Sequence, residues 1–203
     1  MTNLYDKIVK GIEGNRSIGG GIETYLQSLK PAVRMLRSAY RKHPVYVPYE
    51  KENIQSAYLI AYLPHYYQLI EKVLREQNPD TLSNKTSINI TFIGGGPGSE
   101  VYGAVKHVLA NNKNLKTIRI TILDINAETW GYSHKIVREN LIGELPSVDD
   151  VEIQWEAYPL NLIDHNSVSS KSDHISKSDL VVVQNCINEI AQNHFLALSK
   201  SPS

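Results

Sequence analysis

The chain has 203 residues, a length that suits one ordinary domain or a compact domain with a helical extension. Hydrophobic residues make up 41% of the chain, which is enough for a buried core and argues against wholesale disorder. Lysine and arginine balance aspartate and glutamate at 21 each, so there is no strong nucleic-acid signal and no global attraction to an anionic membrane.

Cysteine content and hydropathy exclude further classes of protein. Cys186 is the only cysteine, so one chain cannot form a disulfide framework or a cysteine-ligated zinc or iron–sulfur site. The first 15 residues carry charge throughout, and no stretch approaches the roughly 20 apolar residues of a membrane span. We therefore expect a soluble, cytoplasmic protein without a membrane partner or a metal.

The first region, residues 1–85, has a helical pattern. Apolar spacing predicts a short helix over 3–12, and the glycine cluster over 14–21 predicts a turn or linker. A helix over 22–40 is expected to be interrupted at Pro31, and the basic residues at its end complement the helix dipole. Residues 43–50 should be extended, because Val47 precedes Pro48.

Residues 52–77 predict a helix in two pieces around Pro64, and a polar linker over 78–87 follows. Tyr58, Tyr62 and Tyr66 are spaced by four residues and therefore share one helix face. Two interpretations are open for these rings. They pack the first region against the second, or they form an aromatic lid over a bound cofactor or substrate.

The second region, residues 86–203, alternates β-branched runs with helical patterns. Strands are predicted over 88–93, 117–123, 151–158 and 179–185, the first of them apolar enough to be buried on both faces. Ser99 and Asn126 are expected to cap the first two helices, the second of which should reach Leu141. The serine-rich stretch 163–178 predicts a mobile loop. This order predicts an α/β fold with a doubly wound, mostly parallel sheet.

A glycine turn follows the first predicted strand directly, over Gly94 to Gly98. A strand, a glycine turn and a helix together bring free backbone N–H groups and a helix N-terminus to the carboxyl end of the strand. Asp124 ends the second strand, where a carboxylate can accept hydrogen bonds from both hydroxyls of a ribose. The two features predict a nucleoside-cofactor site.

The spacing of the turn discriminates between cofactors. The dinucleotide pattern G-x-G-x-x-G fails at Ser99, which disfavours a nucleotide-binding oxidoreductase, and a phosphate-binding loop fails because no lysine follows the turn. What remains is G-x-G-x-G at Gly94, Gly96 and Gly98. This turn, with "LDIN" around Asp124 and the fourth strand DLVVVQNCINEI, resembles the class I S-adenosylmethionine-dependent methyltransferases over roughly residues 86–195.

The resemblance implies a Rossmann-like fold that binds S-adenosyl-L-methionine, with residues 1–85 as a lid, a substrate-binding region or a packing region. The cofactor-binding residues that it implies follow the turn and the ends of the strands: Gly94, Gly95, Gly96, Pro97, Gly98, Glu100, Asp124, Ile125, Glu156, Ala157 and Asn185. Tyr158 is a further candidate beside the adenine. The methyl acceptor, a small molecule or an RNA or protein partner, is not readable from the sequence.

Three departures from the family pattern bear on function. Phe92 stands where many members have an acidic residue two positions before the first glycine, and Glu100 is a candidate substitute. Asn185-Cys186-Ile187-Asn188 is not the Asn/Asp-Pro-Pro-aromatic signature of amino-methylating nucleic-acid enzymes. The last three of seven family strands are apparently lacking, which leaves strand four as an open edge for a partner chain or a second copy to cover.

Candidate catalytic residues follow the fourth strand. Asn185 and Asn188 are predicted to line the site, Glu189 and His194 are candidate bases, and Cys186 is interpreted as a small buried filler. Among the other polar aromatic residues, packing is expected for His65 and Trp130 and solvation for His107 and His134. The main hypothesis is a methyltransferase. The alternative is a non-catalytic S-adenosylmethionine-binding or assembly subunit derived from one.

Overall fold

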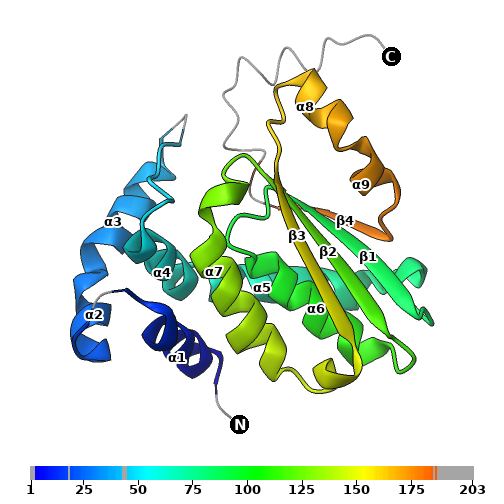
Figure 1. Ribbon diagram of the computed structural model, residues 1–203, viewed down its shortest axis with the longest axis horizontal. Helices are drawn as coiled ribbons and strands as arrows, with labels where there is room; N and C mark the ends of the chain where they lie inside the picture. The colour runs from blue at the N-terminus through cyan, green and yellow to red at the C-terminus, as the bar shows by residue number, and fades with distance from the viewer. Residues whose placement is uncertain (1–2, 18, 43–44, 185, 187–203) are drawn as a thin grey trace.

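The computed structural model describes residues 3–17, 19–42, 45–184 and 186, and its centre is a parallel β-sheet flanked by helices (Figure 1). Its strands are β1 (Ser87–Ile93), β2 (Thr117–Asp124), β3 (Glu152–Pro159) and β4 (Leu180–Val183). They lie in the order β3-β2-β1-β4, and every neighbouring pair is parallel. The chain therefore moves outward from β1 to β3 and returns to β4 on the other side, which confirms the α/β class and the predicted parallel sheet.

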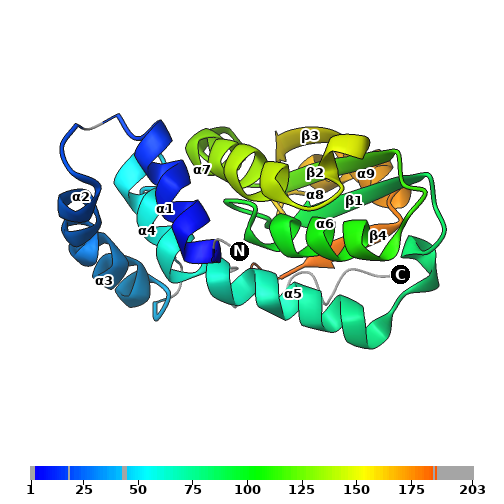
Figure 2. The same ribbon diagram turned by 90° about the horizontal axis from the view of Figure 1, so that it is seen from below.

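In its described residues, the first region forms five helices. They are α1 (Leu4–Asn15), α2 (Ile22–Ser28), α3 (Lys30–Ala39), α4 (Glu52–Ala61) and α5 (Leu63–Gln77). Helix α5 runs next to α6 (Ser99–Asn111), whereas α1 to α4 lie beyond α7 (Gly131–Ile136) (Figure 2). Of the helices among the described residues, none is both long and apolar enough to cross a membrane.

The ends of these helices follow local sequence signals. Asn3 and Asp6 form a capping box at the start of α1, where each side chain accepts a hydrogen bond from the other residue's backbone amide. Pro31 and Pro64 occupy the first turns of α3 and α5, where a missing N–H leaves no hydrogen bond unmade. Both predicted interruptions are therefore confirmed as new helix starts.

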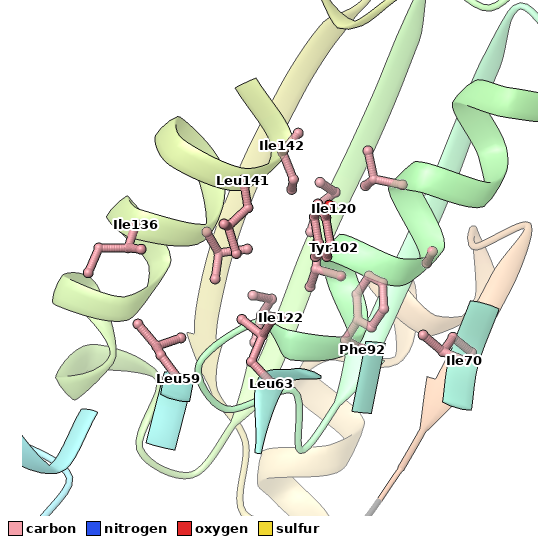
Figure 3. Packing of buried hydrophobic residues seen from close by; sticks show 14 of the residues in the cluster. Leu59, Leu63, Ile70, Phe92, Tyr102, Ile120, Ile122, Ile136, Leu141 and Ile142 are labelled. Carbon is pink, nitrogen blue, oxygen red and sulfur yellow. The ribbon is translucent and has the colours of Figure 1, made fainter. Parts of the chain in front are cut away.

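One hydrophobic core joins the two regions without a break at residue 85. It includes Leu59 and Leu63 from the first region and Phe92, Ile120 and Ile122 from the sheet (Figure 3). Helices α5 and α6 approach closely at Gly103, where an added Cβ would lie 2.4 Å from the Tyr67 carbonyl oxygen. The glycine permits this contact because it has no side chain.

The sheet is not equally apolar on its two faces. Along β1, Ile88, Ile90 and Phe92 enter the core, while Asn89 and Thr91 point to the opposite face because side chains alternate. There Asn89 Nδ2 donates to the Lys177 carbonyl at 3.0 Å, and Thr91 Oγ1 donates to the His174 carbonyl at 3.3 Å. Thr91 is 1% exposed and Asn89 is half-buried, so β1 is covered on both faces as predicted, but its second face is polar and not apolar.

The stretch 163–178 is helical, which corrects the prediction of a loop. It forms α8 (His165–Ser170) and α9 (Ser172–Ser176), neither of which has a buried residue. Asp164 Oδ1 accepts from the Asn166 amide at 3.0 Å, and several serine hydroxyls donate to carbonyls three residues earlier. These local bonds and the contacts with Asn89 and Thr91 compensate for the lack of apolar residues.

Both predicted helix caps were also wrong. Gly98, with φ of +87°, caps α6, and Ser99 is the first helical residue, where the structure gives its buried hydroxyl no hydrogen-bond partner among the described residues. Asn126 precedes a 3₁₀ turn, Ala127–Thr129, and does not cap it through its side chain. The helix predicted to reach Leu141 is divided into α7 and a π-helical turn, Val137–Leu141.

Candidate functional site

A cavity of about 630 Å³ lies at the carboxyl ends of β1 and β2. This is the edge at which ligands bind in open α/β sheets, and the volume falls in the range of small-molecule sites. Its walls come from six parts of the chain: Tyr40, Val45, Tyr46, Val47, Tyr49, Tyr58, Gly94, Gly96, Pro97, Leu123, Asp124, Ile125, Asn126, Trp130, Leu160, Asn161, Leu162, Ile163 and Cys186.

One side of the cavity, the glycine wall, consists of Gly94, Gly96, Pro97 and Asp124. Gly94 has φ of +67°, a conformation that other residues rarely adopt, and an added Cβ would lie 2.1 Å from the Cys186 Cβ. The turn and Asp124 lie side by side on this wall, as the order of strand, turn and acid predicted.

The backbone amides of the three glycines at 94, 96 and 98 are not free, which corrects an expectation drawn from the sequence. Gly94 N donates to the Leu123 carbonyl at 2.7 Å, and Gly98 N donates to the Gly95 carbonyl at 2.9 Å. Gly96 N donates to Asp124 Oδ2 at 3.0 Å. A ligand therefore meets the bare Cα surface of this turn and not these three donors.

Asp124 organises the end of β2 as well as lining the cavity. Its Oδ1 accepts from the Asn126 amide at 2.8 Å and from the Trp130 indole Nε1 at 3.3 Å. A carboxylate offers about four lone-pair directions, and the protein occupies three of them with the bond from Gly96. The carboxylate of this lining residue is thus held in a fixed orientation, with about one acceptor direction not used by these bonds.

His134 fixes the other side of the Gly96 residue. Its Nε2 lies 2.7 Å from the Gly96 carbonyl oxygen, which can only accept, so Nε2 carries the hydrogen. Burial lowers the pKa of His134, and the hydrogen bond to Gly96 only partly opposes that shift. The prediction of a solvated His134 was wrong, because α7 turns this residue toward the glycine turn.

Three other aromatic predictions have mixed outcomes. Trp130 packs as predicted, with 2% of its surface exposed. His107 is buried against expectation, and that burial lowers its pKa. His65 was predicted to pack and is exposed. The helical periodicity of the sequence could not predict whether each histidine is buried, because burial depends on which other element covers that side of its helix.

The opposite side of the cavity, the tyrosine wall, consists of Tyr40, Tyr46, Tyr49 and Tyr58. The hydroxyls of Tyr40 and Tyr49 lie 2.6 Å apart, and the ring of Tyr58 meets Trp130 edge-on at 5.8 Å. Burial raises the pKa of Tyr58 well above its ordinary value, with a smaller contribution from Tyr40, so this phenol stays protonated.

Both interpretations of the tyrosines at 58, 62 and 66 describe part of the geometry. Tyr58 lines the cavity, as a lid residue would, while Tyr62 and Tyr66 stack on one another at 5.9 Å outside it. The sequence analysis did not predict Tyr40, Tyr46 and Tyr49 as site residues, because no local pattern joins them to the glycine turn. The only signal in the sequence was the close spacing of these three tyrosines.

The cavity meets the β3 side of the sheet beyond the strand. Of the described residues near that strand end, Leu160, Asn161, Leu162 and Ile163 line it, whereas Glu156, Ala157 and Tyr158 do not. The prediction that Glu156, Ala157 or Tyr158 would contact the adenine therefore does not fit the cavity, because it counted back from a strand end that lies at Pro159. Ile125, in contrast, lies on the cavity wall and is 64% exposed.

The acidic residues near the turn have unequal access to the cavity. Glu100 is 5% exposed in the first turn of α6 and does not line the cavity. A carboxylate in this position is stabilised by the helix dipole, which was the alternative interpretation of this residue. Phe92 points into the core and supplies no acceptor. Asp124 is therefore the only charged residue among the described residues that line the cavity.

Most of the candidate catalytic residues cannot be placed. Asn185, Asn188, Glu189 and His194 lie outside the described residues. Cys186 is half-buried on the cavity wall, and its Sγ lies 3.5 Å from the Ile93 carbonyl oxygen. The described residues contain no group of three histidine, cysteine, aspartate or glutamate side chains that could hold a metal ion.

β4 was predicted to be an edge strand, and it lies at one edge of the described sheet. Its residues Val181 and Val183 are 38% and 45% exposed.

Comparison with known proteins supplies no independent guide to this site, since no family model matches the chain and no curated protein matches it.

Proposed function

We propose that this protein binds S-adenosylmethionine in the cavity and is a methyltransferase. One observation carries the proposal: the side-chain-free turn after β1 and the carboxylate after β2 line the same cavity, at the edge of the sheet used for nucleoside cofactors. The motif resemblance adds the choice of cofactor, because the turn lacks the third glycine of dinucleotide sites.

The charge of the cavity supports a cationic nucleoside. Asp124 is its only charged lining residue among those described, and aromatic rings surround the remaining space. A sulfonium nucleoside is compatible with one carboxylate and several tyrosines, because cations are attracted to the faces of aromatic rings. A dinucleotide brings a pyrophosphate, for which these walls offer no lysine or arginine.

The residues present fit the roles that such a cofactor requires. Asp124 has acceptor capacity left for one ribose hydroxyl, and the bare surface of Gly94 and Gly96 allows close approach. The apolar residues at 160, 162 and 163 suit the faces of an adenine ring. When bound, S-adenosylmethionine supplies an activated methyl group, so the protein contributes chiefly by orienting the acceptor and excluding water.

Replacement of Asp124 tests the proposal. Asp124→Asn keeps the size of the side chain but loses the charge and one acceptor oxygen, so we expect S-adenosylmethionine affinity to fall at least tenfold. Isothermal titration calorimetry with S-adenosylmethionine, S-adenosylhomocysteine and NAD measures this loss. Asp149→Asn, at an exposed acid beside the amino end of β3, is the matched control and should bind like the wild type.

The outcomes separate three functions. Binding of NAD without S-adenosylmethionine would end the methyltransferase proposal. Tight S-adenosylmethionine binding with no transfer of a labelled methyl group to any fraction of a cell extract would favour a non-catalytic binding subunit. Equal affinity in Asp124→Asn and Asp149→Asn, with both variants folded by circular dichroism, would show that the ribose does not lie at Asp124.

A further inference from the structure

One segment of this neutral chain carries a local excess of positive charge. Residues 24–49 contain five lysines and arginines and no aspartate or glutamate. Since the whole chain has no net charge, the remaining residues carry an excess of five acidic groups. A neutral total therefore conceals a strong local field, which total composition could not reveal.

Four of these cations form a stripe along α3. Lys30, Arg34, Arg37 and Arg41 are spaced by four, three and four residues, which aligns them on one side of the helix and of the turn that continues it. All four are exposed. The structure gives no ion pair between this basic stripe and any carboxylate in the described part of the chain.

The stripe adjoins the tyrosine wall of the cavity. Burial raises the pKa of Tyr62, and the guanidinium groups of Arg37 and Arg41 oppose that rise, so both lie within electrostatic reach of this phenol. The Tyr62 ring in turn lies 5.5 Å from Tyr40 and 5.0 Å from Tyr58, and both of those line the cavity. The cations of Arg37 and Arg41 therefore lie near the tyrosine wall, with the ring of Tyr62 linking them to residues that line the cavity.

Tyr46, on the same tyrosine wall, supplies an exposed aromatic surface and marks the entrance of the cavity. It lines the cavity yet is 81% exposed, the highest exposure among the large hydrophobic residues that the structure describes. An exposed ring beside a row of cations is the arrangement that binds single strands, in which bases stack on aromatic faces and phosphates meet lysine and arginine. Inside the cavity the only charge on the described lining is Asp124, which repels a phosphate but not a neutral base.

We propose that α3 and residues 45–49 bind single-stranded nucleic acid, with phosphates on Lys30, Arg34, Arg37 and Arg41 and a base on Tyr46 at the cavity entrance. Only the role of that strand as the methylated substrate rests on the proposed function; the binding surface does not. A single strand fits better than a duplex, because its bases are free to leave the stack and reach a pocket.

Fluorescence anisotropy with a labelled single-stranded RNA of about 12 nucleotides tests the surface. The full chain should bind, and the logarithm of the association constant should fall linearly with the logarithm of salt concentration. The triple variant Arg34→Gln/Arg37→Gln/Arg41→Gln should make that slope shallower by about 2, at about 0.7 per phosphate contact on a single strand. Its affinity at about 100 mM salt should fall at least tenfold.

Matched variants separate this site from general charge effects. Lys113→Gln/Lys116→Gln/Lys135→Gln removes three exposed cations outside the stripe and should keep the wild-type slope. Tyr46→Ala should weaken binding about tenfold without changing the slope, because it removes stacking and no charge.

Several results would overturn the inference. They are the absence of RNA binding at about 50 mM salt, equal losses in the two triple variants, and a preference for heparin or anionic lipid vesicles with no effect of Tyr46→Ala. Calorimetry with S-adenosylmethionine on the stripe variant keeps the two proposals apart, since its affinity should be unchanged. RNA binding without cofactor binding would refute the proposed function alone.

Discussion

The two walls of the cavity are built in different ways. The glycine wall belongs to the sheet, and its polar groups are fixed by Asp124, His134 and Trp130 through hydrogen bonds at 2.7–3.3 Å. The tyrosine wall belongs to α3, α4 and the segment between them, and its rings meet mainly edge-on, with one hydroxyl pair between Tyr40 and Tyr49. Rigid construction suits the constant part of a ligand, and the more exposed wall suits the part that varies.

Gln55 connects the two walls. This side chain is 1% exposed, and its Nε2 donates to the Tyr49 carbonyl at 2.8 Å and to the Thr129 carbonyl at 2.6 Å. Its Oε1 accepts from the Ser133 amide at 2.9 Å and from the Ser133 hydroxyl at 2.8 Å. One amide therefore ties the tyrosine wall to the loop after β2 and to α7.

Removal of this connection between the two walls should have the largest effect on stability. Gln55→Leu keeps the volume but leaves buried polar groups without partners, so we expect the free energy of unfolding to fall by about 3 kcal/mol. Urea denaturation followed by circular dichroism measures the loss. Gln27→Leu, on the exposed side of α2, is the control and should change stability little. A loss below about 1 kcal/mol would show that the walls are joined elsewhere.

Acid should loosen the glycine wall next. Burial lowers the pKa of His134 below its ordinary 6.5 in the folded protein, so the unfolded chain binds a proton more readily. Stability from this residue is therefore full above pH 6.5 and is lost as the pH falls below it. His107 contributes in the same direction, because burial lowers its pKa too.

His134→Gln should reduce that pH dependence, because an amide can still donate to the Gly96 carbonyl but does not titrate. Thermal midpoints between pH 5 and pH 8 measure the change, and His65→Gln, at an exposed position, should keep the wild-type profile. Identical profiles in both variants would mean that His134 is already solvated in the native state.

The smallest expected effect lies within the tyrosine wall. Tyr40→Phe removes one partner of the hydroxyl pair, so stability should fall by about 1 kcal/mol. A double-mutant cycle with Tyr49→Phe should give a coupling of similar size between the two positions. Additive losses in the urea midpoints would show that the two hydroxyls act independently.

Local rules predicted most of the elements. The prolines at 31 and 64 fixed helix starts, and the four predicted β-branched runs became the four strands of the described sheet. The failures also have local causes. Ser99 and Asn126 are good capping residues in general, yet the turn geometry at Gly98 and the 3₁₀ turn at 127–129 put the helix starts elsewhere.

The candidate site was predictable only on one side. The cavity is lined by five of the residues that the resemblance implied: Gly94, Gly96, Pro97, Asp124 and Ile125. They were predictable because each lies at the end of a strand, or within a few residues of it, and that strand end could be read from the sequence. The histidines at 107 and 134 were misjudged because burial depends on what packs from outside the helix. The polar stretch 163–178 was misjudged because hydrogen bonds to Asn89 and Thr91 replaced apolar burial.

The amino-acid sequence by itself determined the alternation of strands and helices, the glycine turn and the acid that follows β2, since these depend on backbone geometry and neighbours a few residues apart. Tertiary structure alone decided that tyrosines near residue 46 line the same cavity as that turn, that His134 holds Gly96, and that cations along α3 lie near the tyrosine wall. Those contacts join segments that are distant in the chain, such as His134 and Gly96 at 38 residues apart, and the shared core, which no local pattern encodes, brings them together.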